Sequence, residues 1–292
     1  METLQITKNR ITDIACSPDG RFAAATDDDG VYLLDAKSME IIRTVKTKEP
    51  AECGAFSPDS QSVCVGMHGG NVLIIQTKNA EERLIKTKAP GFSTAAWSPD
   101  GRLICLGQYE PALTLIATDT WKSIVLDPDI YDDSGRTKVL FSENSEDIMS
   151  TAGNQICIWQ KPSGSRYVSD VLLTADHGGR FTDMLLGPDR ALFAIEESEQ
   201  ESYLHKLASR PGEKPTTVKL PDYFSRLAWT EKHKCIAVAE FPGKKLIYRK
   251  PGDLSEEFHE PADVGEYPIA CITECPESGF LLIGTRNGSV LH

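Results

Sequence analysis

The sequence lacks a long apolar run and a leader-like start. No stretch approaches the roughly 20 consecutive apolar residues that a membrane-spanning helix needs. The first residues, Met1-Glu2-Thr3-Leu4-Gln5-Ile6, contain neither the basic region nor the apolar core of a secretory signal. We therefore expect no direct membrane insertion.

Basic residues are outnumbered by acidic ones, 31 to 43, and the formal net charge is −12. Proteins that bind DNA or RNA regardless of its sequence neutralise backbone phosphates with Lys and Arg. An acidic chain is unsuited to that role and to docking on anionic lipid. We therefore expect no nucleic-acid partner.

The cysteines lack the spacing of a metal site. Six of the eight lie at scattered positions in expected strands, while Cys271 and Cys275 form a Cys-x3-Cys pair without a second Cys or His pair nearby. Structural zinc sites need such a second pair. Free Cys packs as a small apolar residue where thiols stay reduced. We expect no metal, and a cytoplasmic location, with nuclear and ciliary locations left open.

Enzyme motifs are missing as well. The chain has no Gly-x-Ser-x-Gly elbow, no P-loop and no Gly-x-Gly-x-x-Gly after a strand. The six His show no i, i+4 pairing, and no carboxylate stands at a fixed spacing beside His68 or His177, which we expect in loops. The sequence therefore predicts no catalytic residue and no cofactor.

The chain does contain a repeated turn. Ser17-Pro18-Asp19-Gly20 returns as Ser57-Pro58-Asp59-Ser60 and Ser98-Pro99-Asp100-Gly101, after 40 and 41 residues. Pro, Asp and Gly each favour a tight turn. Four weaker copies follow at spacings of 44, 45, 43 and 45 residues, and they begin at Ser142, Gly187, Thr230 and Cys275. Seven turn signals at one period indicate a repeat array.

Each turn lies between two short apolar runs, such as Ile14-Ala15-Cys16 and Phe22-Ala23-Ala24-Ala25. A third strand and a more polar fourth strand follow, as at 31–35 and 41–45. Four short strands every 40 to 45 residues is the period of a propeller blade. We therefore predict an all-β fold, a seven-bladed β-propeller with four-stranded antiparallel blades in one domain, 1–292. The expected blades are about 11–46, 51–87, 92–127, 136–172, 180–220, 224–260, and 267–292 together with 3–8.

The last unit ends at His292, after its third strand, and a spare strand precedes the first unit. We expect this N-terminal strand to pair in the last blade and close the ring, because an open edge would invite aggregation. The ending also leaves open that the chain is one domain of a longer protein with neighbouring domains.

The sequence resembles the WD-repeat β-propellers over essentially its whole length. The best-matching unit runs from Ser17 to Asp35, and Ile158-Trp159-Gln160 is close to the closing Trp-Asp of the family. No Trp-Asp dipeptide occurs, and no Gly-His pair opens a blade. The resemblance implies a degenerate member that works as an adaptor or scaffold. We expect its hydrogen-bonded Asp-His-Ser-Trp network to be largely absent and apolar packing to hold the blades.

One face of such a propeller carries the loops between blades and the loops between second and third strands. Arg10 and Arg180 stand seven residues before a turn, Arg136 stands six before and Arg226 four before. Arg and aromatic side chains are typical of binding hot spots, and Arg matches carboxylates and phosphates. The candidate partner-binding residues are Arg10, Phe92, Tyr109, Arg136, Arg180, Phe181, Tyr223, Phe224, Arg226, Phe241, Tyr267 and Arg286.

We interpret this face as the site for a protein or peptide partner, with an acidic or phosphorylated segment as the sharper hypothesis. In the alternative interpretation, Phe92, Phe181 and Phe224 are core, and the Arg side chains are solvated and paired with nearby acids. The predicted function is a non-catalytic protein–protein interaction scaffold or adaptor in a multiprotein assembly. The alternative is a propeller enzyme or small-ligand-binding propeller that uses the mouth of the central channel.

Overall fold

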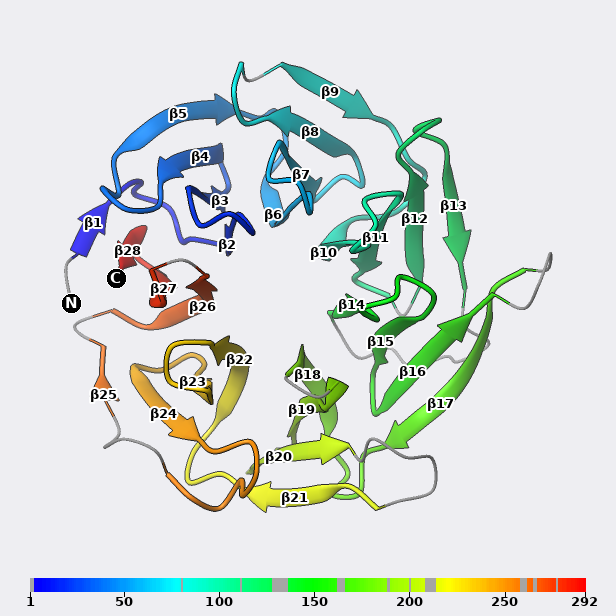
Figure 1. Cartoon of the computed structure of the whole chain (residues 1–292), viewed down its shortest axis with the longest axis vertical. Helices are drawn as coiled ribbons and strands as arrows, with labels where there is room; N and C mark the ends of the chain where they lie inside the picture. The colour runs from blue at the N-terminus through cyan, green and yellow to red at the C-terminus, as the bar shows by residue number, and fades with distance from the viewer. Residues whose placement is uncertain are drawn as a thin grey trace.

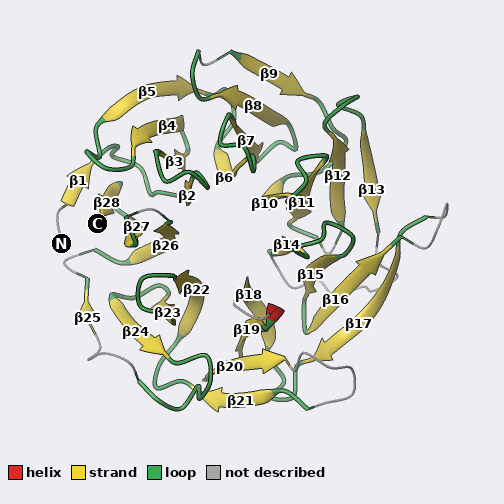
Figure 2. Ribbon diagram, viewed as in Figure 1, coloured by secondary structure: helices red, strands yellow, loops and turns green. Residues whose placement is uncertain are grey.

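The protein folds into seven four-stranded antiparallel sheets arranged as blades around a central axis, as the computed structural model in Figure 1 shows. The structure describes residues 3–79, 81–110, 112–127, 136–161, 166–187, 190–199, 201–207, 214–257, 262–264, 267–276 and 278–292. These residues form strands and loops without an α-helix; the short red segment in Figure 2, between β18 and β19, is of the 3-10 type. The predicted seven-bladed, all-β propeller is confirmed.

The strands follow one another from the inside of each blade to its outside. Blades 1 to 3 contain β2 (Asp13–Cys16), β3 (Phe22–Asp27), β4 (Gly30–Asp35) and β5 (Ile41–Lys46); β6 (Ala51–Phe56), β7 (Ser62–Met67), β8 (Val72–Gln76) and β9 (Glu82–Ile85); and β10 (Phe92–Trp97), β11 (Leu103–Gln108), β12 (Leu113–Ala117) and β13 (Ser123–Leu126).

Blades 4 to 6 repeat this order, and blade 7 takes its outer strand from the start of the chain. They contain β14 (Val139–Phe141), β15 (Ile148–Ala152), β16 (Gln155–Gln160) and β17 (Val168–Thr174); β18 (Arg180–Leu186), β19 (Leu192–Glu197), β20 (Ser202–Leu207) and β21 (Thr216–Lys219); β22 (Phe224–Thr230), β23 (Cys235–Glu240), β24 (Lys245–Arg249) and β25 (Ala262–Asp263); and β26 (Ile269–Cys275), β27 (Phe280–Thr285), β28 (Ser289–Leu291) and β1 (Thr3–Gln5).

The repeated turn joins the first two strands of each blade. In the first turn, the Ser17 hydroxyl donates to Asp19 at 2.7 Å and accepts the Phe22 amide at 2.9 Å. Each turn ends on a residue with a left-handed backbone, which Gly adopts most readily. These residues are Gly20, Ser60, Gly101, Ser145, Arg190, Lys234 and Gly279. The last two turns are one residue longer than the others, which explains their weak sequence match.

The hydrophobic core is divided among the seven junctions between blades. Each of seven buried apolar clusters combines residues from two adjacent blades. Between blades 5 and 6, for example, the fully buried Phe193 packs with Phe224 and Val238. Each blade therefore depends on both neighbours for the burial of its faces.

The N-terminal strand closes the ring, as predicted. β1 pairs antiparallel with β28, with Thr3 opposite Leu291 and Gln5 opposite Ser289. The Ile6 amide adds a hydrogen bond of 3.0 Å to the Gly288 carbonyl. Both ends of the chain therefore lie at the same junction (Figure 1).

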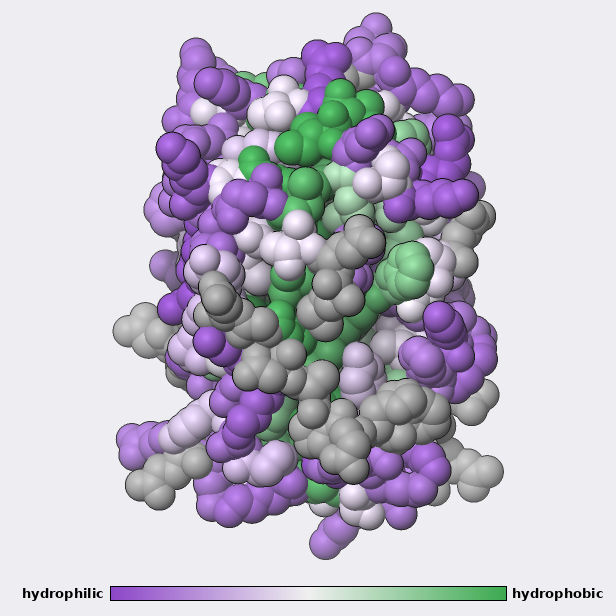
Figure 3. All heavy atoms as spheres, turned by 90° about the vertical axis from the view of Figure 1, so that its left-hand side faces the viewer, coloured by the Kyte–Doolittle hydropathy of each residue, from purple (hydrophilic) through white to green (hydrophobic). Residues whose placement is uncertain are grey.

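The surface beside this junction is mostly hydrophilic, with an apolar strip running between the polar residues (Figure 3). Elsewhere, large apolar side chains are exposed on outer strands, among them Ile42 on β5 and Val125 on β13. Among the described residues, no helix is long and apolar enough to cross a bilayer.

Buried polar networks are more extensive than the sequence indicated. The Trp159 indole donates to the Ser150 hydroxyl at 2.8 Å in blade 4. The fully buried Asp27 accepts a hydrogen bond of 2.6 Å from Thr7 in blade 1. Apolar packing therefore does not stand alone in these blades, because Trp159, Ser150 and Asp27 make buried polar contacts beside it.

Candidate binding site at the channel mouth

Five arginines from different parts of the ring converge on one pocket. It has a volume of about 390 Å³, and we call Arg10, Arg136, Arg180, Arg226 and Arg286 the arginine collar. Arg10 and Arg136 precede the innermost strands β2 and β14, and Arg180 begins β18. Arg226 lies within β22, and Arg286 follows β27. The pocket is lined by the collar together with Phe181, Thr182, Glu197, Ser225, Phe241 and Pro242.

The collar is strongly cationic, because Glu197 is the only acidic residue among the described residues that line the pocket. Within the described chain, the collar makes one ion pair at 4 Å or less. In this pair the Arg136 guanidinium lies 3.7 Å from the Glu52 carboxylate. Among the described residues, no carboxylate lies this close to the other four arginines. The alternative, in which these side chains pair with nearby acids, therefore applies within the described residues to Arg136, while Asp183 and Asp13 also act on Arg226 from a greater distance.

Phe241 supports the collar through its ring. The Arg226 guanidinium carbon lies 4.4 Å from the ring centroid and that of Arg286 lies 5.2 Å from it. Such cation–π contacts stabilise Arg by about 0.5–2 kcal/mol, depending on desolvation. Burial lowers the pKa of Arg226, and the nearby Arg136 lowers it further, while Asp183 opposes both effects. An anion in the pocket would relieve this repulsion.

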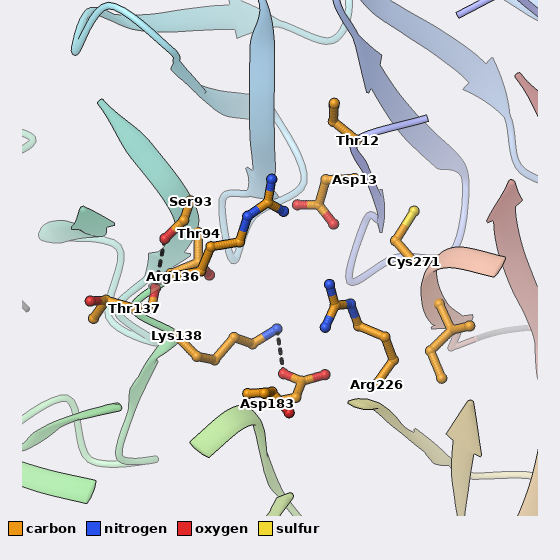
Figure 4. Close-up of a pocket in the computed structure, with 12 residues that line it drawn as sticks. Thr12, Asp13, Ser93, Thr94, Arg136, Thr137, Lys138, Asp183, Arg226 and Cys271 are labelled. Carbon is orange, nitrogen blue, oxygen red and sulfur yellow. Dashed lines mark hydrogen bonds and ion pairs between the residues drawn. The ribbon is translucent and has the colours of Figure 1, made fainter. Parts of the chain in front are cut away.

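A second, smaller cavity of about 80 Å³ continues from the pocket and shares Arg136, Thr182 and Arg226 with it. Six of its lining residues occupy one repeat position, four residues before each turn. They are Asp13, Thr94, Lys138, Asp183, Arg226 and Cys271. We call these six residues the channel wall. Figure 4 shows the charged members directed toward a common space.

The channel wall is balanced in charge, unlike the collar. The Lys138 ammonium lies 3.0 Å from an Asp183 carboxylate oxygen, and the other Asp183 oxygen accepts the Leu227 amide at 2.8 Å. Burial lowers the pKa of Lys138, but Asp183 and Asp13 outweigh burial, and the pKa is raised. Burial raises the pKa of Asp13 despite an amide hydrogen bond from Gly54. The wall thus holds the blades together by paired polar groups.

Seven of the twelve candidate residues line the pocket: the five arginines, Phe181 and Phe241. Tyr223 is 41% exposed and lines an adjoining pocket of about 650 Å³, together with Arg180 and Glu197. Tyr109 lies outside these pockets, with its ring edge against His68, and Tyr267 is exposed but lines none of them. The pocket therefore gathers candidate residues from blade 1 and from blades 4 to 7, while Tyr109 of blade 3 lies outside it.

Three candidate aromatics require correction. Phe92 and Phe224 are fully buried and Phe181 is 3% exposed, so all three belong to the core between blades. In each case a β-bulge lies directly after the Phe, where the register shifts before the channel-facing residue. The bulge breaks the alternation of the strand. The Phe can then pack between blades although the residue two positions later faces the channel.

A simple count along the repeat would have identified these core positions. The residue six before each turn is apolar in six blades, and Arg136 is the exception in blade 4. The same count, made four residues before each turn, would have found Lys138, Asp13 and the rest of the channel wall. Of these, the sequence analysis identified only Arg226 as a candidate.

A group of His177, Glu196 and His205 has donor atoms within 4.8 Å of one another, as a metal site would. Glu196 Oε2 lies 3.1 Å from a ring nitrogen of each His. Its other oxygen accepts the amides of His177 and Gly179, and the remaining His205 nitrogen contacts Thr217 at 2.9 Å. The hydrogen bonds of this network are made within the protein, and they stabilise blade 5.

Comparisons with known proteins support the fold. The family model for the WD domain, G-beta repeat (WD40), matches residues 2–34. Hydrazine synthase from Kuenenia stuttgartiensis has a similar structure, with a TM-score of 0.81 at 14% identity over 99% of this chain and 97% of that chain. The β-propeller domain of Cps50 (Swd1) from Myceliophteria thermophila gives a TM-score of 0.77 at 12% identity over 99% and 98% of the two chains.

No curated protein matches the sequence significantly. At such low identities, the two solved structures show a shared fold and nothing about activity. Together, the matched first repeat and the seven-bladed architecture confirm the resemblance to WD-repeat propellers.

Proposed function

We propose that this propeller, whose first repeat fits the WD-repeat family model, is a non-catalytic interaction scaffold that binds an acidic or phosphorylated segment of a partner protein at the arginine collar. WD-repeat propellers commonly serve as protein-interaction scaffolds. Five guanidinium groups that face one pocket with a single carboxylate carry the proposal. Their forks match carboxylates and phosphates, and each added contact can be charge-assisted.

The shape of the site favours a peptide segment over a small metabolite. The collar pocket and the adjoining pocket share Arg180 and Glu197, so the two form an extended surface along the mouth. The exposed Tyr223 lies on this surface and could contact a side chain of the partner. A small anionic ligand is the second candidate, because about 390 Å³ lies within the usual range of small-molecule pockets.

A binding role without catalysis fits the lining of both cavities. Among the described residues, neither cavity is lined by a His, and the acidic groups of the channel wall are engaged by Lys138 or by backbone amides. General acid–base catalysis needs a group that is free to exchange a proton with its substrate. We therefore assign both cavities to the binding of a partner.

The test compares two triple charge reversals. In the collar variant, Arg10, Arg180 and Arg286 are replaced by Glu; in the control variant, the exposed Arg21, Arg43 and Arg102 on other surfaces are replaced by Glu. Both variants change the net charge equally. Partners captured from extract are identified by mass spectrometry, and binding of acidic, phosphorylated and neutral peptides is measured by fluorescence anisotropy.

We expect the collar variant to lose specific partners and to bind anionic peptides more than about tenfold more weakly. The control variant should keep both activities. Equal partner lists and equal affinities for the two variants would contradict a role of the collar. Loss of phosphoserine or inorganic phosphate binding, with no change in captured proteins, would favour the small anionic ligand instead.

A further inference from the structure

Two cysteines meet at the junction that closes the ring. Cys16 ends β2 in blade 1, and Cys275 ends β26 in blade 7. Their sulfur atoms lie 2.7 Å apart, and the Cys16 thiol is directed at the Cys275 sulfur. A disulfide bond needs a separation of about 2.05 Å, so only a small movement separates the two thiols from bond formation.

The pair is specific to this junction. In the repeat, Cys16 stands directly before a turn and Cys275 is the first residue of a turn. The residues directly before the other turns are Phe56, Trp97, Phe141, Leu186, Trp229 and Glu274, and the other turns begin with Ser17, Ser57, Ser98, Ser142, Gly187 and Thr230. The six other junctions therefore have no cysteine at either position.

The ring also closes beside this junction, because β1 pairs non-covalently with β28 in blade 7 and the chain then continues into β2 of blade 1. The closing strand β1 contributes only three residue pairs to β28. Cys16 and Cys275 are 259 residues apart in the sequence. A bond between them would join the first blade directly to the last one.

The surroundings of the pair suit reactivity. The hydrogen bond from Cys16 lowers the pKa of Cys275, and Ser278 lowers it further, while burial opposes both effects. The same contact, together with burial, raises the pKa of Cys16, so Cys275 is the thiol of the pair that ionises more readily. Cys16 is only half-buried, which gives a small reagent access to the pair. By contrast, burial raises the pKa of Cys64 and Cys105, as expected for inert core thiols.

We propose that Cys16 and Cys275 are a redox-sensitive pair that forms a disulfide in the presence of a hydroperoxide and locks the ring closed. One thiol takes an oxygen from the hydroperoxide and becomes a sulfenic acid, while the peroxide is reduced to water or an alcohol. The second thiol attacks this sulfur. The S–S bond forms, the S–O bond breaks, and the oxygen leaves as water with the proton of the second thiol.

Peptide mapping of the intact chain tests the proposal directly. The folded protein is treated with hydrogen peroxide, its remaining thiols are alkylated, and the digest is analysed by mass spectrometry. We expect a cross-linked peptide pair that contains Cys16 and Cys275 and disappears after treatment with a thiol reductant. Alkylation of both residues after peroxide treatment, or pairing of either one with a different cysteine, would overturn the proposal.

Melting experiments test the effect on the ring. Peroxide should raise the apparent melting temperature by roughly 5 °C or more in the wild type and in the control variant Cys157→Ala. The variant Cys16→Ser should show no such rise. An equal response of Cys16→Ser, or no rise in the wild type, would count against the lock. If Cys16→Ser does not fold, the peptide map of the wild type still shows whether the disulfide bond forms.

Discussion

Trp97 shows how a single side chain can join two blades. It ends β10 in blade 3, and its indole donates a hydrogen bond of 3.0 Å to the Ala55 carbonyl in blade 2. Its ring packs against the apolar cluster between these blades. The residue therefore combines apolar burial with a directed contact across the junction.

We predict that Trp97→Ala lowers the free energy of unfolding by about 3 kcal/mol, since it removes both the ring and the hydrogen bond. Trp97→Phe keeps most of the ring and should cost about 1 kcal/mol. Denaturant unfolding of the two variants measures both values. A cost for Trp97→Ala below about 0.5 kcal/mol would be that of a surface residue and would contradict this role.

The network in blade 5 predicts a dependence of stability on pH. Burial raises the pKa of Glu196, but the hydrogen bonds from His177 and Gly179 outweigh burial, and the pKa lies below 4.5. Burial lowers the pKa of His205 below 6.5. Both groups bind protons less readily in the folded state than in the unfolded state. Their contributions are complete above the unfolded pKa values and are lost as the pH falls through the folded ones.

We therefore expect the melting temperature to decrease as the pH falls below 6.5, first through His205 and then, below about 4.5, through Glu196. The variant His205→Gln should remove the part of this dependence nearest neutral pH. Melting curves at a series of pH values compare the two proteins. Identical slopes in wild type and variant would show that His205 does not contribute.

At the scale of one element, β1 is short but holds the ring closed. It supplies the outer strand of blade 7, and the segment after it contributes Thr7 to the Asp27 network of blade 1. Leu4 and Ile6 pack against the cluster between blades 7 and 1. Its loss would expose the edge of β28 and weaken two blades at once.

We predict that deletion of residues 1–8 lowers the melting temperature by many degrees. A synthetic peptide of residues 1–8, added in excess, should restore part of the loss, because it can pair with β28 again. Thermal unfolding followed by circular dichroism measures both effects. An unchanged melting temperature after the deletion would rule out a closing role for β1.

For the whole molecule, the division of the core among seven junctions predicts cooperative unfolding. Ile11 is fully buried between blades 7 and 1, and Phe193 is fully buried between blades 5 and 6. We expect Ile11→Ala and Phe193→Ala each to cost about 2–5 kcal/mol. Each should shift one common transition, followed by circular dichroism and by tryptophan fluorescence. Separate transitions for the two signals would indicate blades that unfold independently.

The sequence was sufficient to predict the order of the blades and the closure of the ring. Turns and strands are formed by residues that are close in the sequence, and the repeat contains each of them seven times. It was also sufficient for the convergence of Arg10 and Arg180, since equal repeat positions lie at equal places around the ring. It left the burial of Phe92 as one of two interpretations, because the bulge after this residue changes the direction of the side chain. The depth of the pocket depends on contacts between blades that no single repeat contains.

The pairing of β1 with β28 also bears on how the protein is made. Synthesis proceeds from the N-terminus, so within the propeller Thr3–Gln5 is made before the other strands, and its partner, Ser289–Leu291, is made after them. Until then, six blades can stack on one another while the edge of the seventh cannot form. The complete ring is therefore reached in a final step, when the first strand of the propeller meets the last one.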